Sequence, residues 1–452
     1  MLRAAGLIER MQSRQIVAIA SVFSHDACTL KDVAGGYGTV FSVGPSVRAK
    51  FLEQAKSRVA KLPPVVYGYL ASAIESLGYT ARYDEVRTVT HMPTPQAAHA
   101  VLVHTTLADN LAERAWMNTL RARGMRVVAF GAACSTAPAS FVEDADVVIV
   151  GEPEAMHPAQ WRSVLNDAQG IVHAGDVHDL DALLLPSWRA FPVHEYRYAF
   201  LANGITLPMQ SARGCPYSCG YCPWRVTASF RERSPEAVVA EARRNRDVYG
   251  AKAISFRDPL FNLSAERSAR IAEGLAPLGL RWSAEMRADR LDYALLRTMH
   301  RGGLRSLELG VESVNRALLI QEKRKPPTEE QIERVVREAA SLGIRVICNF
   351  VLGLPGDSLE GMKETIAWAK ELNSFAVQFT VATPYPGTSL AQKRATSLPV
   401  VDANMTGFTA TQLEGGVSPE ALAALREWAY VSYHFRPRFI AGFVPQLVRA
   451  LV

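Results

Sequence analysis

Two successive alternations of apolar strands and helices limit the folds open to this chain. Continuous apolar strands separated by helices are typical of parallel sheets covered on both faces. Within residues 1–175, strands are expected at 16–20, 80–83, 100–104, 127–130 and 147–150, and helices at 65–77 and 112–123. This first alternation predicts an open α/β domain of the Rossmann or flavodoxin type. Such domains bind ligands beyond the carboxyl ends of their strands.

The second alternation predicts a partial (β/α)6 barrel over residues 206–390. Its expected strands are 207–211, 253–256, 280–285, 306–309, 346–352 and 376–382, and its expected helices are 236–249, 265–275, 293–300, 329–342 and 359–372. Residues 176–205, rich in proline and aromatic residues, are interpreted as a linker. Residues 391–452 are expected to form a small, mainly helical C-terminal segment, with a helix over 419–433. The apolar end, 439–452, either caps the barrel or touches a membrane surface.

Three cysteines directly follow the first expected barrel strand. Cys215, Cys219 and Cys222 form a C-x3-C-x2-C loop, and thiolates favour zinc or iron–sulfur clusters. A structural zinc site usually takes four ligands, whereas this loop has no fourth Cys or His and the next cysteine is Cys348. Three ligands suit a four-iron cluster that keeps one iron open for a substrate. A zinc knuckle and unliganded buried thiols are the alternatives, and no disulfide is expected.

This spacing, with Tyr221 just before the last cysteine, resembles the radical S-adenosylmethionine (SAM) superfamily. Upstream, the stretches 63–71, 131–137 and 145–152 resemble the cobalamin-binding domain that precedes many radical SAM cores. The expected cobalamin contacts lie in small, polar strand-end loops: Thr105, Thr106, Gly131, Ser135, Thr136, Gly151 and Glu152. An Asp-x-His-x-x-Gly motif is absent, so the resemblance implies cobalamin without a protein histidine on cobalt. The alternative is a flavodoxin-like domain with another ligand or none.

The resemblance also implies which barrel residues hold SAM on the cluster. Matching positions are Glu285, Glu312, Asn349, which matches a ribose-binding position, and Arg324. Glu312 has the alternative of capping the following helix. Asp258 is expected on the active face, in contact with cofactor or substrate. The polar wall of the barrel is therefore predicted to bind SAM.

Over residues 15–440 the chain resembles a cobalamin-dependent radical SAM enzyme. The resemblance implies methylation of an unactivated carbon through methylcobalamin and a 5′-deoxyadenosyl radical. The rivals are a ring-forming or rearranging enzyme with the same cofactors, a radical SAM enzyme that has lost cobalamin, and a non-catalytic cobalamin or SAM sensor. Methylthiotransferases are disfavoured because only Cys28 and Cys134 precede the loop. The implied partners are a small-molecule or natural-product substrate and a reductant such as flavodoxin or ferredoxin.

Composition supports a globular cytoplasmic protein, with 48% hydrophobic and 21% charged residues. No apolar run is long enough for a transmembrane helix, and the N-terminus lacks the apolar core of a signal peptide. Six cysteines suit a reducing compartment. The net charge of +6 comes from scattered arginines, so no nucleic-acid partner is expected. Peripheral membrane contact through the C-terminal end stays open.

Overall fold

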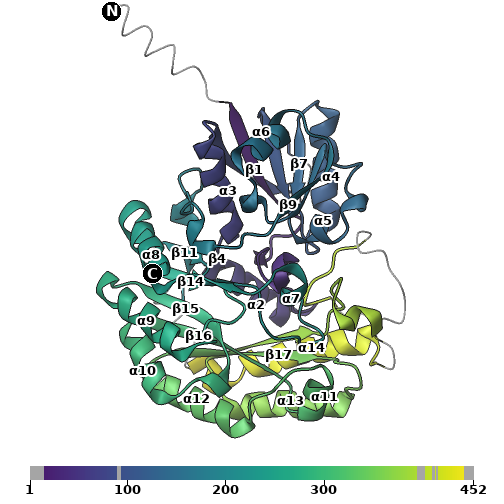
Figure 1. Cartoon of the computed structure of the whole chain (residues 1–452). Helices are drawn as coiled ribbons and strands as arrows, with labels where there is room; N and C mark the ends of the chain where they lie inside the picture. Colours follow the sequence, from purple (N-terminus) through teal and green to yellow (C-terminus); the bar gives the residue numbers. More distant parts are fainter. Residues whose placement is uncertain (1–14, 89–92, 394–402, 410–412, 414–415, 442–452) are drawn as a thin grey trace, which may run out of the picture. The chain divides into compact units, whose positions relative to one another are not determined.

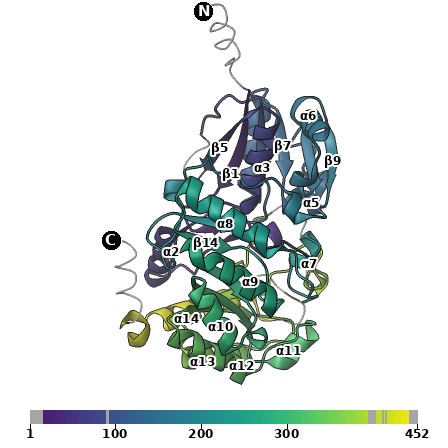
Figure 2. The same cartoon turned by 60° about the vertical axis from the view of Figure 1, so that its left-hand side comes forward.

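The computed structural model describes residues 15–88, 93–393, 403–409, 413 and 416–441. It divides into two compact units (Figures 1 and 2). The first comprises the described part of Met1–Asp26 with Val66–Val177 and Ala182–Phe191. The second comprises Ala27–Val65, His178–Asp181 and the described part of Pro192–Val452. Residues 27–65, which the expected boundary at 175 assigned to the N-terminal domain, therefore group with the second unit.

The first unit is built on a parallel six-stranded sheet. Its spatial order is β5-β1-β6-β7-β8-β9, so the second strand in sequence lies outside the first, as in flavodoxin-like sheets. The bounds are β1 Ile16–Phe23, β5 Thr80–Arg87, β6 Ala100–His104, β7 Val127–Phe130, β8 Val147–Gly151 and β9 Gly170–Gly175. The direction of winding reverses at β1, between β5 and β6. This order confirms the predicted fold class.

Helices of the first unit include α3 (Val65–Ser76), α4 (Asn110–Ala122), α5 (Ala132–Thr136) and α6 (Pro158–Asn166). Both predicted helices are present, as α3 and α4. The edge strand β9 was not predicted. Its residues alternate between partly buried and exposed, so it lacks the continuous apolar run that marks the central strands.

The second unit contains six parallel strands in consecutive order, which confirms the partial barrel. They are β11 Thr206–Met209, β14 Ala253–Phe256, β15 Arg281–Met286, β16 Leu304–Glu312, β17 Arg345–Leu352 and β18 Ala376–Val381. The connecting helices are α8 Pro235–Tyr249, α9 Ala265–Leu275, α10 Tyr293–Arg301, α11 Arg316–Gln321, α12 Glu329–Ser341 and α13 Leu359–Leu372. They line the outer side of the curved sheet (Figures 1 and 2).

Side-chain alternation along the barrel strands separates an apolar core from a polar interior. In β16, Leu307, Leu309 and Val311 are buried in the core with residues of the outer helices. Glu308, Gly310 and Glu312, on the other face of the same strand, line a cavity. Because successive strand residues point to opposite faces, this arrangement is the ordinary period-two pattern of a strand. It brings charged residues into the barrel without burying them in the apolar core.

The second unit also contains the helices α2 (Val47–Val59) and α14 (Pro419–His434) and the short helix α7 (Trp224–Thr227) after the cysteine loop. Helix α14 confirms the predicted helix at 419–433. The Arg426 guanidinium donates to the backbone oxygens of Phe408 and Val43, the latter at 3.0 Å. The Phe379 amide donates to the Tyr430 hydroxyl at 3.0 Å, which ties α14 to β18.

Much of the apolar C-terminal stretch, residues 442–452, lies outside the described residues, and so do 394–402. Among the helices that the structure describes, none is long and apolar enough to cross a membrane.

Candidate functional site

The cysteine loop follows β11 and the short strand β12 (Ala212–Arg213). Gly214 begins the loop with a φ of 70°, and a Cβ there would lie 2.3 Å from the Ser229 carbonyl oxygen. Only glycine meets both conditions. Further along, the Gly220 amide donates to the Glu322 carbonyl at 2.8 Å, and the Leu390 amide donates to the Gly220 carbonyl at 3.0 Å. Distant backbone segments therefore fix the conformation of the loop.

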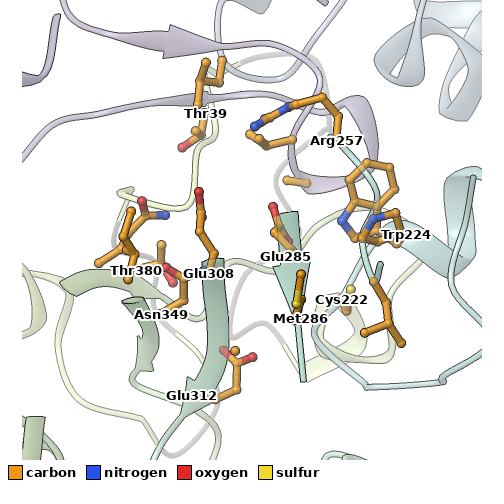
Figure 3. Close-up of a pocket in the computed structure, with 18 of the residues that line it drawn as sticks. Thr39, Cys222, Trp224, Arg257, Glu285, Met286, Glu308, Glu312, Asn349 and Thr380 are labelled. Atoms are coloured by element: carbon orange, nitrogen blue, oxygen red, sulfur yellow. The ribbon is translucent and has the colours of Figure 1, made fainter. Parts of the chain in front are cut away.

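All three loop cysteines line a cavity of about 320 Å³ that lies entirely within the second unit. Inward-facing residues of five barrel strands or their ends supply much of its wall (Figure 3). These residues are Ser255, Arg257, Glu285, Arg287, Glu308, Gly310, Glu312, Ile347, Asn349, Gln378 and Thr380. Residues of 28–62, including Thr39 and Phe41, also contribute. The cysteines thus share one cavity with the predicted SAM contacts.

The thiol arrangement differs from that of a mononuclear metal site. Across the described part of the chain, no three His, Cys, Asp or Glu side chains form a group suited to one metal ion. The thiolates of a four-iron cluster need not converge on one ion, because each binds a different iron. Burial raises the pKa of the Cys215 and Cys222 thiols, so a bound metal has to displace their protons. Soft thiol donors in one cavity fit an iron–sulfur cluster.

Glu312 occupies a strained backbone position at the end of β16. Its φ is 73°, and the register with β17 shifts between Gly310 and Glu312. A glutamate with positive φ is uncommon, and such strain clusters at functional sites. The Arg324 guanidinium pairs with the Glu312 carboxylate at 3.3 Å and also donates to the Gly310 carbonyl. The bulge and this ion pair together direct Glu312 into the cavity.

Helix capping does not account for Glu312. The next helix, α11, has Asn315 as its N-cap, and the Asn315 side chain accepts from the Leu318 amide at 3.3 Å. The carboxylate of Glu312 faces Arg324 instead.

Four buried polar atoms of residues that line the cavity have no hydrogen-bond partner among the described residues. They are the Asn349 Oδ1, the Tyr221 hydroxyl oxygen, the Thr39 Oγ1 and the Arg324 Nε. A buried polar atom without a partner costs free energy unless a ligand or water supplies one. Asn349 was predicted to bind the ribose of SAM, and an amide oxygen accepts a hydrogen bond from a ribose hydroxyl. The residues present therefore fit a polar ligand in this cavity.

Glu285 and Glu308 add acidic groups to the same wall. They are register partners on β15 and β16, and both point into the cavity (Figure 3). Burial and then the charge of Glu308 raise the pKa of Glu285. The Arg257 guanidinium also lines this cavity, and it binds Asp32 with two hydrogen bonds of 3.0 and 3.1 Å. Neither Glu308 nor Arg257 was singled out from the sequence.

Asp258 does not reach the cavity, contrary to the sequence prediction. It is fully buried, and its carboxylate accepts from the Ser211 amide at 2.7 Å and from the Ser211 hydroxyl. It therefore holds the end of β11 in place. Its neighbour Arg257 lies on the inward face, because Ser255 and Arg257 are two residues apart and share that face. Strand periodicity was the signal that could have identified Arg257.

In the first unit, the predicted strand-end loops come together at the carboxyl edge of the sheet. The Cys134 amide donates to the Thr105 hydroxyl at 3.1 Å, and the Gly151 amide donates to the Ser135 hydroxyl at 3.2 Å. Gly131 has a φ of 123°, and a Cβ there would lie 2.4 Å from the Thr105 carbonyl oxygen. The three loops thus form one continuous edge with close backbone approaches.

Several of these loop residues hold the edge together through internal bonds. Thr105 and Thr106 are fully buried, and Thr106 donates to Glu113 from its amide and its hydroxyl, at 2.7 and 2.8 Å. Thr136 donates to the Ala132 carbonyl at 2.8 Å, while the Glu152 carboxylate accepts from the Val177 amide at 2.7 Å. The two buried threonines build the scaffold. Ser135, Gly151 and Glu152 are only partly buried and lie nearer the surface.

A model of the radical SAM superfamily matches residues 209–369, which run from the end of β11 into α13. The matched segment contains the cysteine loop and the strands that carry Glu285, Glu312 and Asn349. Over this segment the chain is similar to the radical SAM superfamily. The cysteine loop lies inside the matched segment, and the first unit lies outside it.

Curated proteins that are similar to this chain include two kinds of enzyme. An uncharacterized methyltransferase of Pyrococcus horikoshii is 28% identical over 58% of this chain and 58% of its own length. An anaerobic magnesium-protoporphyrin IX monomethyl ester cyclase of Rubrivivax gelatinosus is 27% identical over 51% of this chain and 42% of its own length. The chain thus matches only about half the length of these relatives.

A solved structure is similar in fold to nearly the whole chain. It is the radical SAM methyltransferase TsrM from Kitasatospora setae, with tryptophan and a SAM analogue bound. Its TM-score is 0.62 at 15% sequence identity, and the match covers 97% of this chain and 89% of TsrM. Another structure of TsrM carries cobalamin and a [4Fe-4S] cluster. At this identity the match establishes a shared fold, including the N-terminal sheet unit.

Proposed function

We propose that this chain is a cobalamin-dependent radical SAM enzyme that methylates an unactivated carbon of a small-molecule or natural-product substrate. The observation that carries the proposal is the barrel cavity itself. Three cysteine thiols, the strained Glu312 and the Asn349 oxygen, which has no partner in the described part of the chain, all line it. The flavodoxin-like strand order of the first unit supports a second large cofactor.

In this proposal Cys215, Cys219 and Cys222 hold a [4Fe-4S] cluster. When bound, the cluster with SAM supplies a 5′-deoxyadenosyl radical, and cobalamin supplies a methyl group. Glu312, positioned by Arg324, and Asn349 bind SAM, the latter at its ribose. Glu285 contributes a carboxylate to the same wall. These groups orient the reactants and hold them at near-attack distance, which is the main contribution of the protein in cofactor enzymes.

Cobalamin is assigned to the strand-end loops of the first unit. Gly131 and Gly151, both with positive φ, let the backbone segments of this edge approach one another closely. His104, at the end of β6, is buried and lies 3.1 Å from the Tyr67 hydroxyl through its Nδ1. The His104 ring is therefore packed inside the first unit. This packing supports the proposal that cobalamin binds without a protein histidine on cobalt. An EPR spectrum of cob(II)alamin with nitrogen splitting from a protein imidazole would contradict this assignment.

The second candidate is ring formation or rearrangement without methyl transfer. Its support is the cyclase relative, whose identity of 27% nearly equals the 28% of the methyltransferase relative. Methyl-labelled SAM separates the two candidates once a substrate is in hand. The label on a product carbon supports methylation, and an unlabelled product formed with 5′-deoxyadenosine supports the cyclase-like reaction.

The proposal includes a cytoplasmic location and a flavodoxin or ferredoxin as reductant. All six cysteines are free, and Cys28, Cys134 and Cys348 are buried as thiols. Free thiols and an oxygen-sensitive cluster suit a reducing compartment. Fractionation of the native cells, with the protein recovered outside the cytosolic fraction, would contradict the location.

A further inference from the structure

A second cavity of about 330 Å³ adjoins the barrel cavity within the second unit. It lies among α2, α14, the beginnings of β17 and β18, and residues 198–200. Its wall is almost wholly apolar or aromatic: Phe41, Phe51, Leu52, Ala55, Val59, Tyr198, Phe200, Ile347, Phe375, Ala376, Val377, Tyr430, Phe435, Phe439 and Ile440. We call this cavity the apolar chamber. Its volume falls at the lower end of the range for small-molecule sites.

The few polar groups of the apolar chamber are mostly engaged. The Tyr430 hydroxyl accepts from the Phe379 amide at 3.0 Å, and the His434 Nδ1 lies 2.9 Å from the Tyr430 carbonyl oxygen. Burial lowers the pKa of His434 to about 4, so its ring is neutral at physiological pH. His434 also packs against Phe439, with ring centroids 4.7 Å apart. A space lined in this way offers water few partners and favours a hydrocarbon.

The apolar chamber shares part of its wall with the barrel cavity. Five residues line both spaces: Phe41, Lys56, Tyr198, Ile347 and Gln378. Ile347 precedes Asn349 by two residues on the inward face of β17, so their Cα atoms are about 7 Å apart along the strand. A ligand in the apolar chamber therefore ends near the residue assigned to the SAM ribose. At the other end, Phe51 and Ile440 are 58% and 43% exposed, which places apolar side chains at the outer surface.

One cationic residue, Lys56, lines both the apolar chamber and the barrel cavity. The Lys56 ammonium lies 5.9 Å from the ring centroid of Phe41 and 5.8 Å from that of Tyr198. Within the described residues Lys56 makes no ion pair. An ammonium held by aromatic faces at the end of an apolar space suits the acidic end of an amphipathic molecule.

We infer that the apolar chamber binds the substrate, and that this substrate has a hydrocarbon body and an anionic end group. The body lies between α2 and α14, and the anionic group lies at Lys56. This inference rests on the proposed function, because it is the adjoining cluster cavity that makes the apolar chamber a substrate site. It defines the substrate class as an amphipathic acid of the fatty-acid or isoprenoid-acid type.

Binding of decanoate to the full-length, iron-reconstituted protein, measured anaerobically by titration calorimetry, tests the inference. Wild-type protein should bind decanoate saturably and more tightly than decanol. Ala55→Phe and Ala376→Phe, which fill the apolar chamber from α2 and from β18, should each weaken binding at least about tenfold. Val47→Phe is the matched control, because Val47 is 87% exposed on the same helix and does not line the apolar chamber.

The anionic end is tested separately. Lys56→Met should abolish the preference for decanoate over decanol, and Lys56→Arg should keep it. Equal binding of both ligands by wild-type protein would overturn the anionic end group. Absence of saturable binding, or unchanged binding in both filling variants with normal iron content, would overturn the apolar chamber as the substrate site. Reductive cleavage of SAM by the same wild-type preparation reports on the proposed function alone, so the two failures are distinguishable.

Discussion

Glu285 and Glu308 are register partners on neighbouring barrel strands, and both carboxyl groups face the cavity that holds the cysteine loop. Two carboxylates in such a space do not both ionise easily. Burial, and then the charge of Glu308, raise the pKa of Glu285 above its usual 4.5. The protonated form of Glu285 is thus favoured in the folded protein.

This relationship predicts a pH dependence of stability. In the unfolded chain Glu285 ionises near its usual pKa, whereas in the folded protein it keeps its proton to higher pH. The free energy of unfolding therefore falls as pH rises above about 4.5 toward the raised pKa. The Glu285→Gln variant has no carboxyl group to ionise at this position. The free energy of unfolding of the variant, relative to that of the wild type, should therefore increase as pH rises from about 4.5 toward the raised pKa. Urea unfolding at several pH values measures the difference, and parallel curves for the two proteins would contradict it.

Glu308→Gln provides a second test of the same pair. Removing the neighbouring charge should lower the pKa of Glu285. The fall in stability of this variant should therefore be complete at a lower pH than in wild type. An unchanged pH profile would mean that burial alone sets the pKa of Glu285.

The cysteine loop should lose its cluster when its remote support is broken. Glu322, which is buried, pairs with Lys393, and its backbone carbonyl accepts from the Gly220 amide at 2.8 Å. Lys393→Met leaves a buried carboxylate without its cation, at a cost of about 1–3 kcal/mol. Iron should be released faster to an anaerobic chelator from this variant than from Lys393→Arg. Equal release rates would show that the pair does not stabilise the loop.

Asn349 should contribute to SAM affinity without affecting the cluster. Its Oδ1 has no partner among the residues described, and it faces the cavity. Asn349→Ala should weaken SAM binding by about 1 kcal/mol, the net value of one hydrogen bond. Asn349→Asp keeps the acceptor and should bind SAM at least as well as wild type. Equilibrium dialysis with labelled SAM, at matched iron content, measures both, and an unaffected alanine variant would remove the ribose assignment.

The sequence predicted the two α/β units because their central strands are continuous apolar runs. It failed where structure depends on packing between distant segments. Helix α2 and the segment before it belong to the barrel unit. In that segment the Val43 carbonyl accepts from Arg426, 383 residues away, and no local sequence pattern predicts this contact. Strand β16 was expected at 306–309 but extends over Leu304–Glu312, because Arg305 on one side and Gly310 and Glu312 on the other interrupt its apolar run.

Part of the site could be predicted from local sequence patterns. The cysteine spacing and the matching positions identified four cavity residues besides the cysteines: Glu285, Glu312, Arg324 and Asn349. Asp258 was wrongly placed because the choice between it and Arg257 depends on which face of the strand end each occupies. The apolar chamber could not be predicted, since its wall combines residues of α2, α14 and two strands.

Loss of the loop thiols tests the iron site by itself. A triple variant of Cys215, Cys219 and Cys222 to alanine should retain almost no iron after reconstitution, because the thiolates are the only protein ligands proposed for the cluster. Wild-type protein should hold about four irons. Stoichiometric zinc in wild-type protein, or unchanged iron in the variant, would contradict the cluster assignment.

The most direct test of the central claim follows the two fates of SAM. Purified protein, reconstituted with iron, sulfide and cobalamin, is reduced anaerobically in the presence of SAM, and the nucleoside products are quantified. The account predicts both S-adenosylhomocysteine, from methyl transfer, and 5′-deoxyadenosine, from reductive cleavage, with both lost in the triple cysteine variant or without reductant. Formation of 5′-deoxyadenosine without S-adenosylhomocysteine would contradict the methyltransferase function, and formation of neither would contradict catalysis itself.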